Sequence, residues 1–423
     1  MKVFKFGGAS VKDADAVRNM AQIIRNHATE PLVVIISAMG KMTNAFENLL
    51  AKRIAEEDAE PELQFIKTFH QKIIDDLGLK DDAGLASIVE NIYEEVDNAL
   101  DKISNSMSYD YIYDQSVSNG ELLSTQIVSH YLTKEGLPNT WLDARKVVKT
   151  DSTHRAALVD WGASQAMIKS QATPLLKNGL VISQGFIGSN AEYNTTTLGR
   201  EGSDFSGAIF ATSLDADSLT IWKDVDGVLN ADPKKFQNHR LYEKLPYKEA
   251  AEMTYYGASV IHPKTIKPLA QKGIPLFVRS FEHPEKEGTM IEECVIPNLP
   301  PAIIHKSNQM IISFKISDFS FINEHHIHLI FDHIKRQQLT INLMQNSAIS
   351  FTICMDDNPK KREQLMTALR DEFLIYYNEG LDMITVKNYN EPTILEIMAE
   401  KEVIIEQRSR NNFQMVYKTK GNA

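Results

Sequence analysis

The chain has 423 residues, of which 43% are hydrophobic and 24% charged, and its net charge is −11. These values fit a globular protein of two or three domains, and the negative charge argues against nucleic acid as a partner. The presence of only two cysteines argues against a disulfide framework, and neither a signal segment nor a membrane-length apolar window is present, so we expect a cytoplasmic protein without a membrane partner.

Short apolar runs alternate with helical patterns over the first 280 residues. We expect strands at Val3–Phe6, Leu32–Ser37, Thr140–Asp143, Leu180–Gln184, Leu219–Lys223 and Leu276–Arg279. Residues 44–132 instead repeat apolar side chains at helical spacing, which indicates core or subunit-packing faces. This alternation predicts an α/β fold with a mainly parallel sheet, in which ligands bind beyond the carboxyl ends of the strands.

The pattern changes at Ile296–Pro301, where a proline-rich stretch indicates a linker. The next segment, from a strand that starts at Met310 to Tyr377, has the order strand–helix–strand–strand–helix–strand, which is typical of a ferredoxin-like domain. The order restarts at Met383 and stops after Tyr417, before a last helix and strand. We therefore predict domains at 1–298, 299–378 and 379–423. Two similar units in tandem indicate a ligand-sensing or dimerising module, with packing alone as the alternative.

The stretch KFGGASV places two glycines directly after the first strand. One interpretation is a tight turn that needs the backbone freedom of Gly7 and Gly8. The other is that their bare N–H groups approach an anion, which Lys5 helps to hold. Short glycine-rich stretches are weak signals, so these residues alone do not decide between the two.

A second stretch, QGFIGSNAEYNTTTLGREGSDFSG, is dense in small and hydroxyl residues between a strand and a helix. A helix that starts near Ser203 and Asp204 would place free N–H groups beside Gly202. Arg200 could then bind a carboxylate through its planar guanidinium. The alternative is a capped loop without a ligand.

Two further stretches carry charge next to predicted elements. IWKDVDGVLNADPKKF is either a solvated turn or a nucleotide site in which Lys234 or Lys235 reaches the phosphates. In SNGELLST, Glu121 lies near a predicted helix start, where an acid usually caps the helix. An acid there could instead bind an ammonium group.

These motifs, in this order, resemble those of the aspartate kinases (aspartokinases), which belong to the amino-acid kinase superfamily. The resemblance covers nearly the whole chain and includes KFGGASV, ISAMGKMTN, SNGELLST, TTTLGREGSD, DVDGV and GASVIHPKT. It implies a three-layer α/β/α, carbamate-kinase-like domain followed by tandem ferredoxin-like ACT domains, through which a homodimer or higher homo-oligomer would form. We expect a monofunctional kinase, because the chain has no GxGxxG unit for a fused dehydrogenase.

The resemblance implies transfer of the γ-phosphoryl group of ATP to the side-chain carboxylate of L-aspartate. This is the first step of lysine, threonine and methionine biosynthesis. Mg²⁺ would be held mainly through phosphate oxygens, with no metal ligand from the protein. The acceptor carboxylate, with a pKa near ~4, is already ionised at neutral pH, so no general base is required.

The resemblance also assigns roles to residues of this chain. The implied catalytic residues are Lys5 and Asp204, the latter orienting Lys5. The implied ATP-binding residues are Lys5, Gly7, Gly8, Ser10, Ser37, Lys223, Asp224, Leu229, Lys234 and Ser259. The implied substrate-binding residues are Thr43, Glu121, Arg200, Glu201, Gly202 and Ser203, with Arg200 on the α-carboxylate and Glu121 on the α-ammonium group.

The chain departs from the family pattern at five positions in the catalytic region. Ala9 replaces a threonine, Glu201 a glycine and Ser259 a lysine. Lys223 and Leu229 stand where threonine and tyrosine are common. The carboxylate of Glu201 would disfavour a bound carboxylate unless it points away, and Lys223 could supply the positive charge that Ser259 lacks.

Three other positions bear on regulation or on local structure. In the regulatory region Ser320 stands for a glycine and Ala348 for a glutamate of lysine-inhibited members, which puts lysine feedback in doubt. His262 precedes a proline, and we predict a structural turn residue there.

Two other functions compete with this interpretation. A related kinase could phosphorylate another acceptor, such as acetylglutamate or a nucleoside monophosphate, but Glu121 and Arg200 match the two charges of a free amino acid. A catalytically inactive amino-acid sensor would explain the loss of polar groups at Ala9 and Ser259. Retention of Lys5 counts against such a sensor.

Overall fold

The computed structural model describes residues 1–27, 30–101, 108–258, 261–316 and 320–419, apart from the side chain of Asn178. The described chain forms two compact units. Unit 1 comprises Met1–Val228, Leu241–Ala251 and Val260–Val295, and unit 2 comprises Leu229–Arg240, Glu252–Ser259 and Ile296–Ala423. No helix among the described residues is both long enough and apolar enough to span a bilayer.

Unit 1 is built on an eight-stranded sheet with the order β3-β4-β2-β1-β7-β9-β10-β8. Neighbouring strands run parallel except β9 and β10, so the predicted mainly parallel sheet is confirmed. Its strands are β1 (Lys2–Phe6), β2 (Leu32–Ile36), β3 (Asn139–Leu142), β4 (Leu180–Gln184), β7 (Ser218–Lys223), β8 (Lys244–Pro246), β9 (Leu276–Ser280) and β10 (Thr289–Glu292). A separate hairpin pairs β5 (Ile187–Ser189) with β6 (Thr195–Thr197).

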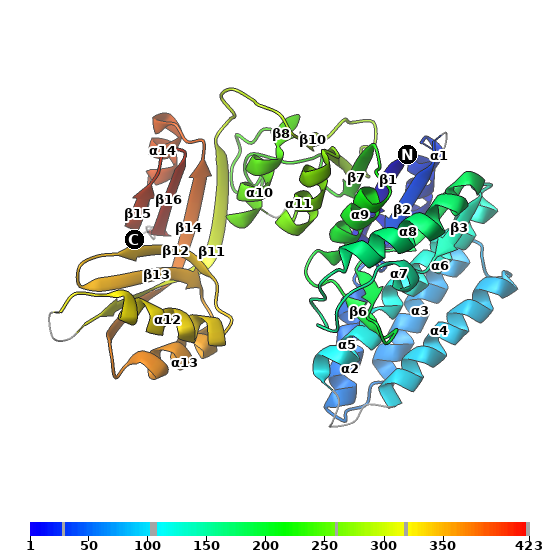
Figure 1. Ribbon diagram of the computed structural model, residues 1–423, viewed down its shortest axis with the longest axis horizontal. Coiled ribbons are helices and arrows are strands. Elements are labelled where there is room, and N and C mark those ends of the chain that lie inside the picture. Colours follow the sequence, from blue (N-terminus) through cyan, green and yellow to red (C-terminus); the bar gives the residue numbers. More distant parts are fainter. Residues whose placement is uncertain (28–29, 102–107, 259–260, 317–319, 420–423) are drawn as a thin grey trace. The chain divides into compact units, whose positions relative to one another are not determined.

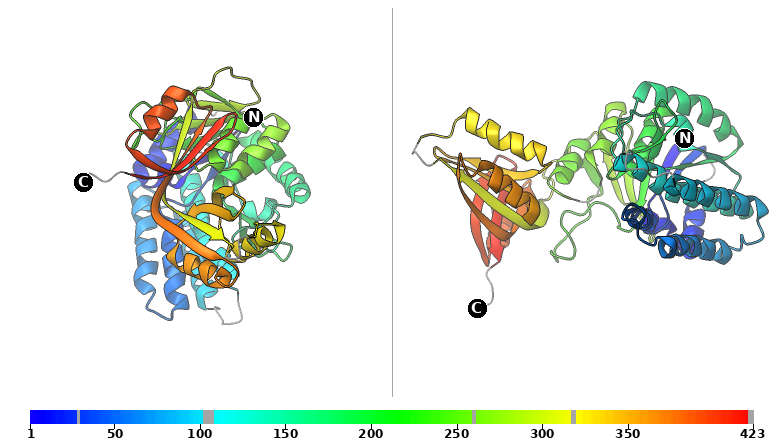
Figure 2. Two further views of the ribbon diagram at one scale, coloured as in Figure 1. Left: turned by 90° about the vertical axis from the view of Figure 1, so that its left-hand side faces the viewer. Right: turned by 90° about the horizontal axis from the view of Figure 1, so that it is seen from below.

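Helices lie on both sides of this sheet (Figures 1 and 2). In chain order they are η1 (Gly8–Val11), α1 (Ala14–Arg25), α2 (Met42–Ile54), α3 (Glu60–Asp76), α4 (Ala83–Asp101), α5 (Tyr109–Val117), α6 (Asn119–Lys134), α7 (Ala144–Val147), α8 (Trp161–Leu175), η2 (Leu176–Asn178), α9 (Gly202–Ser213), α10 (Tyr247–Tyr255) and α11 (Pro263–Lys272). The helical block predicted over residues 44–132 corresponds to α2–α6.

The first strand shows how the sequence positions the site. Because side chains alternate across a strand, Phe4 and Phe6 share one face of β1 and pack against the buried Trp222 of β7. Lys5 points to the other face, beneath α9, where a Cβ atom at Gly207 would lie 3.5 Å from Cβ of Lys5. The alternation of β1 therefore carries Lys5 into the core at the carboxyl end of the sheet.

Unit 2 contains a six-stranded antiparallel sheet with the order β12-β13-β11-β14-β16-β15. Its strands are β11 (Ala302–Lys315), β12 (Ile341–Asn346), β13 (Ser350–Asp356), β14 (Leu374–Lys387), β15 (Lys401–Arg408) and β16 (Asn412–Thr419). Its helices are α12 (Glu324–Arg336), α13 (Pro359–Leu369) and α14 (Glu391–Met398). Two apolar clusters anchor α12 and α13 to β11 and β13, and α14 to β14 and β16.

The two ferredoxin-like units share strands, which the sequence did not predict. β11 begins eight residues before the predicted start at Met310, and β14 is continuous where we expected two strands (Figure 1). The second half of β11 pairs with β13 and with the start of β14, which completes the predicted first unit. The first half of β11 pairs with the end of β14 and supplies the closing strand that the second unit was expected to lack. The predicted boundary at residues 378/379 thus lies within β14.

Candidate active site

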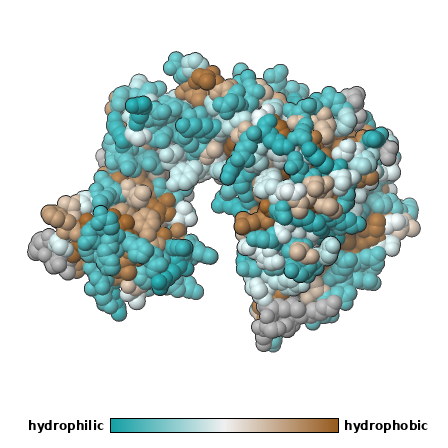
Figure 3. Space-filling model, in the orientation of Figure 1, coloured by the Kyte–Doolittle hydropathy of each residue, from teal (hydrophilic) through white to brown (hydrophobic). Residues whose placement is uncertain are grey.

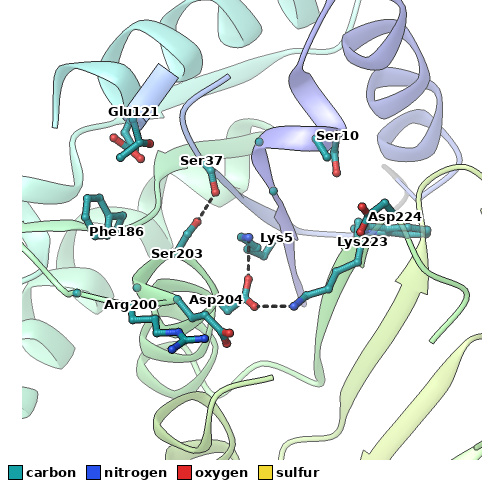
Figure 4. Close-up of a pocket in the computed structure, with 18 of the residues that line it drawn as sticks. Lys5, Ser10, Ser37, Glu121, Phe186, Arg200, Ser203, Asp204, Lys223 and Asp224 are labelled. Atoms are coloured by element: carbon teal, nitrogen blue, oxygen red, sulfur yellow. Dashed lines mark hydrogen bonds and ion pairs between the residues drawn. The ribbon is translucent and has the colours of Figure 1, made fainter. Parts of the chain in front are cut away.

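A cavity of about 570 Å³ opens at the carboxyl ends of β1, β2, β4 and β7 in unit 1. Loops and helix N-termini from distant parts of the sequence form its wall (Figure 4). The cavity brings together most of the predicted site residues: Lys5, Gly7, Gly8, Ser10, Ser37, Thr43, Glu121, Arg200, Glu201, Gly202, Ser203, Asp204, Lys223 and Asp224.

Three predicted ATP-binding residues are not among those that line this cavity. Leu229 and Lys234 belong to the segment Leu229–Arg240, which groups with unit 2. Ser259 lies outside the described residues. The roles predicted for these three residues therefore stay predictions.

The cavity wall also includes residues that the motifs did not predict. These are Ala9, Tyr113, Arg155, Phe186, Gly199, Trp222 and Phe281. Ala9, Phe186, Gly199 and Trp222 stand inside the quoted stretches, so proximity to a motif could have identified them. Tyr113, Arg155 and Phe281 come from segments without a glycine-rich signature.

Lys5, Asp204 and Lys223 form a buried charge cluster in one wall of the cavity. Nζ of Lys5 lies 2.7 Å from Oδ1 of Asp204, and Nζ of Lys223 lies 3.3 Å from Oδ2 (Figure 4). Burial acts to raise the pKa of Asp204, but the two ammonium groups outweigh it and hold that pKa below its usual value. Asp204 therefore stays ionised and fixes two cations at the end of β1 and β7.

The glycine loop after β1 needs glycine for close approach rather than for an unusual backbone angle. A Cβ atom at Gly8 would lie 2.6 Å from the carbonyl oxygen of Gly40 and 2.9 Å from that of Ala38. The N–H of Gly40 in turn donates to the carbonyl of Gly8 over 3.0 Å. Ser10, in the 3₁₀ turn that follows, buries a hydroxyl that has no hydrogen-bond partner among the described residues. The loop is thus a tight turn that also exposes backbone to the cavity.

Glu121 is a buried carboxyl group on the opposite side of the cavity. It lies in the first turn of α6, but Ser118 is the N-cap residue, and Glu121 accepts a hydrogen bond from the N–H of Ala38 over 3.3 Å. Its Oε2 is buried without a partner among the described residues. Desolvation raises the pKa of Glu121 to about 8, opposed by the Ala38 N–H and by Lys5. Such a group is poised to receive a cation.

The loop before α9 places hydroxyl and charged groups between Glu121 and the charge cluster. Ser203 Oγ accepts a hydrogen bond from Ser37 Oγ over 2.7 Å, which links the N-terminus of α9 to the end of β2 (Figure 4). Gly185 makes room for this contact, because a Cβ there would lie 2.0 Å from Ser203 Oγ. Arg200 is exposed at the cavity mouth, with a side chain that can reach a ligand.

Glu201 adds a carboxylate to the same loop in a strained backbone conformation. Its φ of 53° is left-handed, a region that favours glycine, and its Oε2 is buried without a partner among the described residues. The nearby Lys264 donates to the carbonyl of Leu198 over 2.9 Å, and burial lowers the pKa of Lys264 to about 8 against the pull of Glu201. His262 caps α11 by accepting from the N–H of Lys264, which confirms its predicted structural role.

Comparisons with known proteins agree with this geometry. The profile of the amino acid kinase family matches residues 1–280. Lysine-sensitive aspartokinase 3 of Escherichia coli is 31% identical over 361 residues, covering 84% of this chain and 78% of that protein. The chloroplastic bifunctional aspartokinase/homoserine dehydrogenase 2 of Arabidopsis thaliana is 35% identical over 300 residues, and the match spans 32% of its length.

A solved structure extends the likeness to the whole chain. The crystal structure of E. coli aspartokinase III in complex with aspartate and ADP superposes with a TM-score of 0.82 at 26% identity, covering 99% of this chain and 96% of that one. The family match, the curated relatives and the cavity geometry lead to one conclusion. The chain belongs to the amino acid kinase family and, within it, to the aspartokinases.

Proposed function

We propose that the protein transfers the γ-phosphoryl group of ATP to the β-carboxylate of L-aspartate and so forms 4-phospho-L-aspartate. The observation that carries this proposal is the pairing of two features across one cavity. Oε2 of Glu121 is buried without a partner among the described residues, and Glu121 lines the same cavity as the ammonium groups of Lys5 and Lys223 that Asp204 holds. An amino group fits the carboxyl group of Glu121, and a polyphosphate fits the ammonium groups of Lys5 and Lys223.

The substrate amino acid would lie between Glu121 and the charge cluster. Its α-ammonium group would lie beside Oε2 of Glu121, for which the described part of the chain supplies no partner. Arg200 would bind the α-carboxylate, and the hydroxyls of Thr43 and Ser203 would donate hydrogen bonds. The β-carboxylate then points toward Lys5, where the γ-phosphoryl group arrives.

Catalysis in this site is mainly electrostatic. A triphosphate and a carboxylate repel each other, and the transition state spreads negative charge over the transferred group. Lys5 and Lys223 are already oriented by Asp204, so they stabilise that charge without reorganising. The backbone N–H groups of Gly7 and Gly8 add donors at the end of β1. The acceptor is ionised at neutral pH, so the step needs no general base.

The nucleotide would use the β1 and β7 ends of the cavity. Ser10 supplies a buried hydroxyl, Lys223 is the last residue of β7, and Asp224 follows it. We propose that ATP occupies this side, with the predicted contributions of Leu229, Lys234 and Ser259 still to be tested.

Magnesium would reach this site with the nucleotide. The described residues contain no group of three or more His, Cys, Asp or Glu side chains that could hold a metal ion. Asp204 is tied to two ammonium groups, so it is a poor ligand for a further cation. Mg²⁺ would thus be held mainly through phosphate oxygens, where it neutralises charge on the phosphates.

We further propose a cytoplasmic homodimer or higher homo-oligomer, with a catalytic domain over residues 1–298 and two ACT units after it. Unit 2 exposes large apolar side chains on β12, the β12–β13 turn and β14, and Figure 3 shows hydrophobic surface among hydrophilic side chains there. These residues are Met344, Ile349, Leu374, Tyr376 and Tyr377. Sedimentation of the purified chain tests the assembly, and a monomer at micromolar concentration would contradict it.

The enzymatic test measures ADP release with L-aspartate and traps the acyl phosphate with hydroxylamine as aspartate β-hydroxamate. N-acetylglutamate and a nucleoside monophosphate serve as competing acceptors. We expect ADP release and hydroxamate formation with L-aspartate and with neither of the competing acceptors. Turnover of another acceptor would support a related kinase, and binding of L-aspartate without turnover would support an inactive sensor.

A further inference from the structure

Arg155 lines the same cavity as Glu121 and Arg200, although no sequence motif includes it. Its guanidinium lies over the ring of Tyr113, 4.6 Å from the centroid, and its Nη1 donates to Oδ1 of Asp110 over 3.1 Å. Asp110 thus engages one of the five N–H groups that a guanidinium carries. The side chain remains 46% exposed, so the other donors are open to a ligand.

The backbone of Arg155 is strained and is held in place by a buried carboxylate. Its φ of 63° lies in the left-handed region, which costs a residue with a side chain about 1 kcal/mol or more. The N–H of Arg155 donates to Asp114 over 3.1 and 3.2 Å, and Asp114 is fully buried. Asp114 also accepts from His154 Nδ1 over 2.8 Å and from the Thr197 hydroxyl over 2.6 Å. Such over-determined strain is typical of residues that must be aimed at a ligand.

This anchoring places Arg155 next to the loop that carries Arg200. The N–H of Ala157 donates to the carbonyl of Thr197 over 3.0 Å. A Cβ atom at Gly199 would lie 2.8 Å from the carbonyl oxygen of Arg155, so the two segments touch through backbone. Two arginines from separate segments that touch through backbone therefore line the same cavity.

The charges of the cavity favour an anion near these two arginines. Lys5 and Lys223 are engaged by Asp204, which leaves Arg155 and Arg200 as the other cationic side chains of the cavity wall among the described residues. Glu201 adds a negative charge directly beside Arg200 in the sequence. Glu201 weakens the hold of Arg200 on a carboxylate, and Arg155, whose pairing with Asp110 engages one N–H group, adds a second guanidinium.

We propose that Arg155 binds the α-carboxylate of the amino-acid substrate together with Arg200, and that Asp114 is the positioning residue that aims it. This assignment rests on the proposed function of the site. The site would then discriminate against ligands that lack an α-carboxylate, because such a ligand leaves the guanidinium groups of Arg155 and Arg200 without an anionic partner.

The test compares two ligands and two arginine variants by calorimetry in the presence of ADP. L-Aspartate carries the α-carboxylate, and L-isoasparagine replaces it by an amide while keeping the β-carboxylate. Arg155→Met keeps the aliphatic cover of Tyr113 but removes the charge. We expect this variant to bind L-aspartate about 10- to 100-fold more weakly than wild type and L-isoasparagine less than about 2-fold more weakly. Arg53→Met, an exposed arginine paired with Asp101, is the matched control and should leave both affinities unchanged.

Further readouts separate ligand binding from a structural role. The affinity for ADP and kcat at saturating L-aspartate should change less than about 3-fold in Arg155→Met, while KM for L-aspartate rises. Asp114→Asn as a single substitution should weaken L-aspartate binding. Added to Arg155→Met, it should cause no further loss of L-aspartate affinity.

Three outcomes would overturn the assignment. The Arg155→Met variant could lose equal affinity for L-aspartate and L-isoasparagine. It could lose ADP affinity to the same degree, or it could bind L-aspartate with wild-type affinity. A wild-type protein that binds ADP but not L-aspartate would instead contradict the proposed function and this assignment with it.

Discussion

Replacement of Glu121 by glutamine should stabilise the unliganded protein at high pH while it abolishes binding of L-aspartate. The folded state raises the pKa of Glu121 from 4.5 to about 8 through desolvation. Between these two values the folded state binds more protons than the unfolded state, so the free energy of unfolding falls as the pH rises through this window. The rise in pKa corresponds to about 4–5 kcal/mol, which the charged carboxylate costs the folded protein above pH 8.

Urea unfolding of wild type and Glu121→Gln at pH 5 and pH 9 measures this cost. The amide oxygen can still accept from the N–H of Ala38, so we expect a difference below about 1 kcal/mol at pH 5. At pH 9 the variant should be the more stable by about 2–4 kcal/mol. Glu90→Gln, an exposed acid on α4, is the control and should show no pH-dependent difference. A Glu121→Gln variant that is less stable than wild type at pH 9 would refute the reasoning.

The same carboxyl group should release a proton when L-aspartate binds. At pH 7 a group with a pKa of about 8 is roughly 90% protonated, and an arriving ammonium group favours the ionised form. Calorimetry in buffers with different ionisation enthalpies should give close to one proton released for wild type. The Glu121→Gln variant should show neither L-aspartate binding nor proton release. Uptake of a proton, or no transfer in wild type, would show that Glu121 does not receive the ammonium group.

Other predictions concern Gly8 in the loop after β1, Lys223 at the end of β7, and inhibition by lysine. Gly8→Ala places a Cβ 2.6 Å from the Gly40 carbonyl, so it should lower both the melting temperature and ATP affinity, whereas Gly162→Ala, with ordinary contacts, should change neither. Lys223→Thr removes a cation that Asp204 orients, so KM for ATP should rise; an unchanged KM would refute a role in nucleotide binding. Lysine should inhibit weakly, because the regulatory loops depart from those of lysine-inhibited members; in the coupled assay, inhibition at concentrations below the KM for L-aspartate would contradict this.

Strands of the eight-stranded sheet in unit 1 were predictable, because burial on both faces of a strand leaves a simple apolar pattern in the sequence. β2 is a continuous apolar run, β4 is apolar or small up to its last residue, Gln184, and all residues of both strands are buried. β11 was predicted too short because its first half, AIIHKSNQ, mixes polar and apolar side chains after a run of prolines. Its partner there is β14, more than 70 residues away, so the pairing is decided by tertiary contacts that no local pattern shows.

The candidate site was predictable where its residues lie in loops with glycine and charge at fixed spacing. Lys5, Glu121 and Asp204 all lie in such stretches, and the structure brings them to one cavity. Arg155 was not predictable in this way, because its position depends on a buried carboxylate and a left-handed backbone angle. Neither feature has a sequence signature that a single chain reveals.

The proposed reaction depends most on Lys5, which Asp204 holds and which would stabilise the charge of the transferring phosphoryl group. Single-turnover formation of aspartate β-hydroxamate from ATP, L-aspartate and hydroxylamine measures this step directly. We expect Lys5→Ala to lower the rate at least about 100-fold with little change in stability, while Lys2→Ala, at the start of the same strand, leaves it unchanged. A Lys5→Ala variant that forms the hydroxamate at the wild-type rate would contradict the claim.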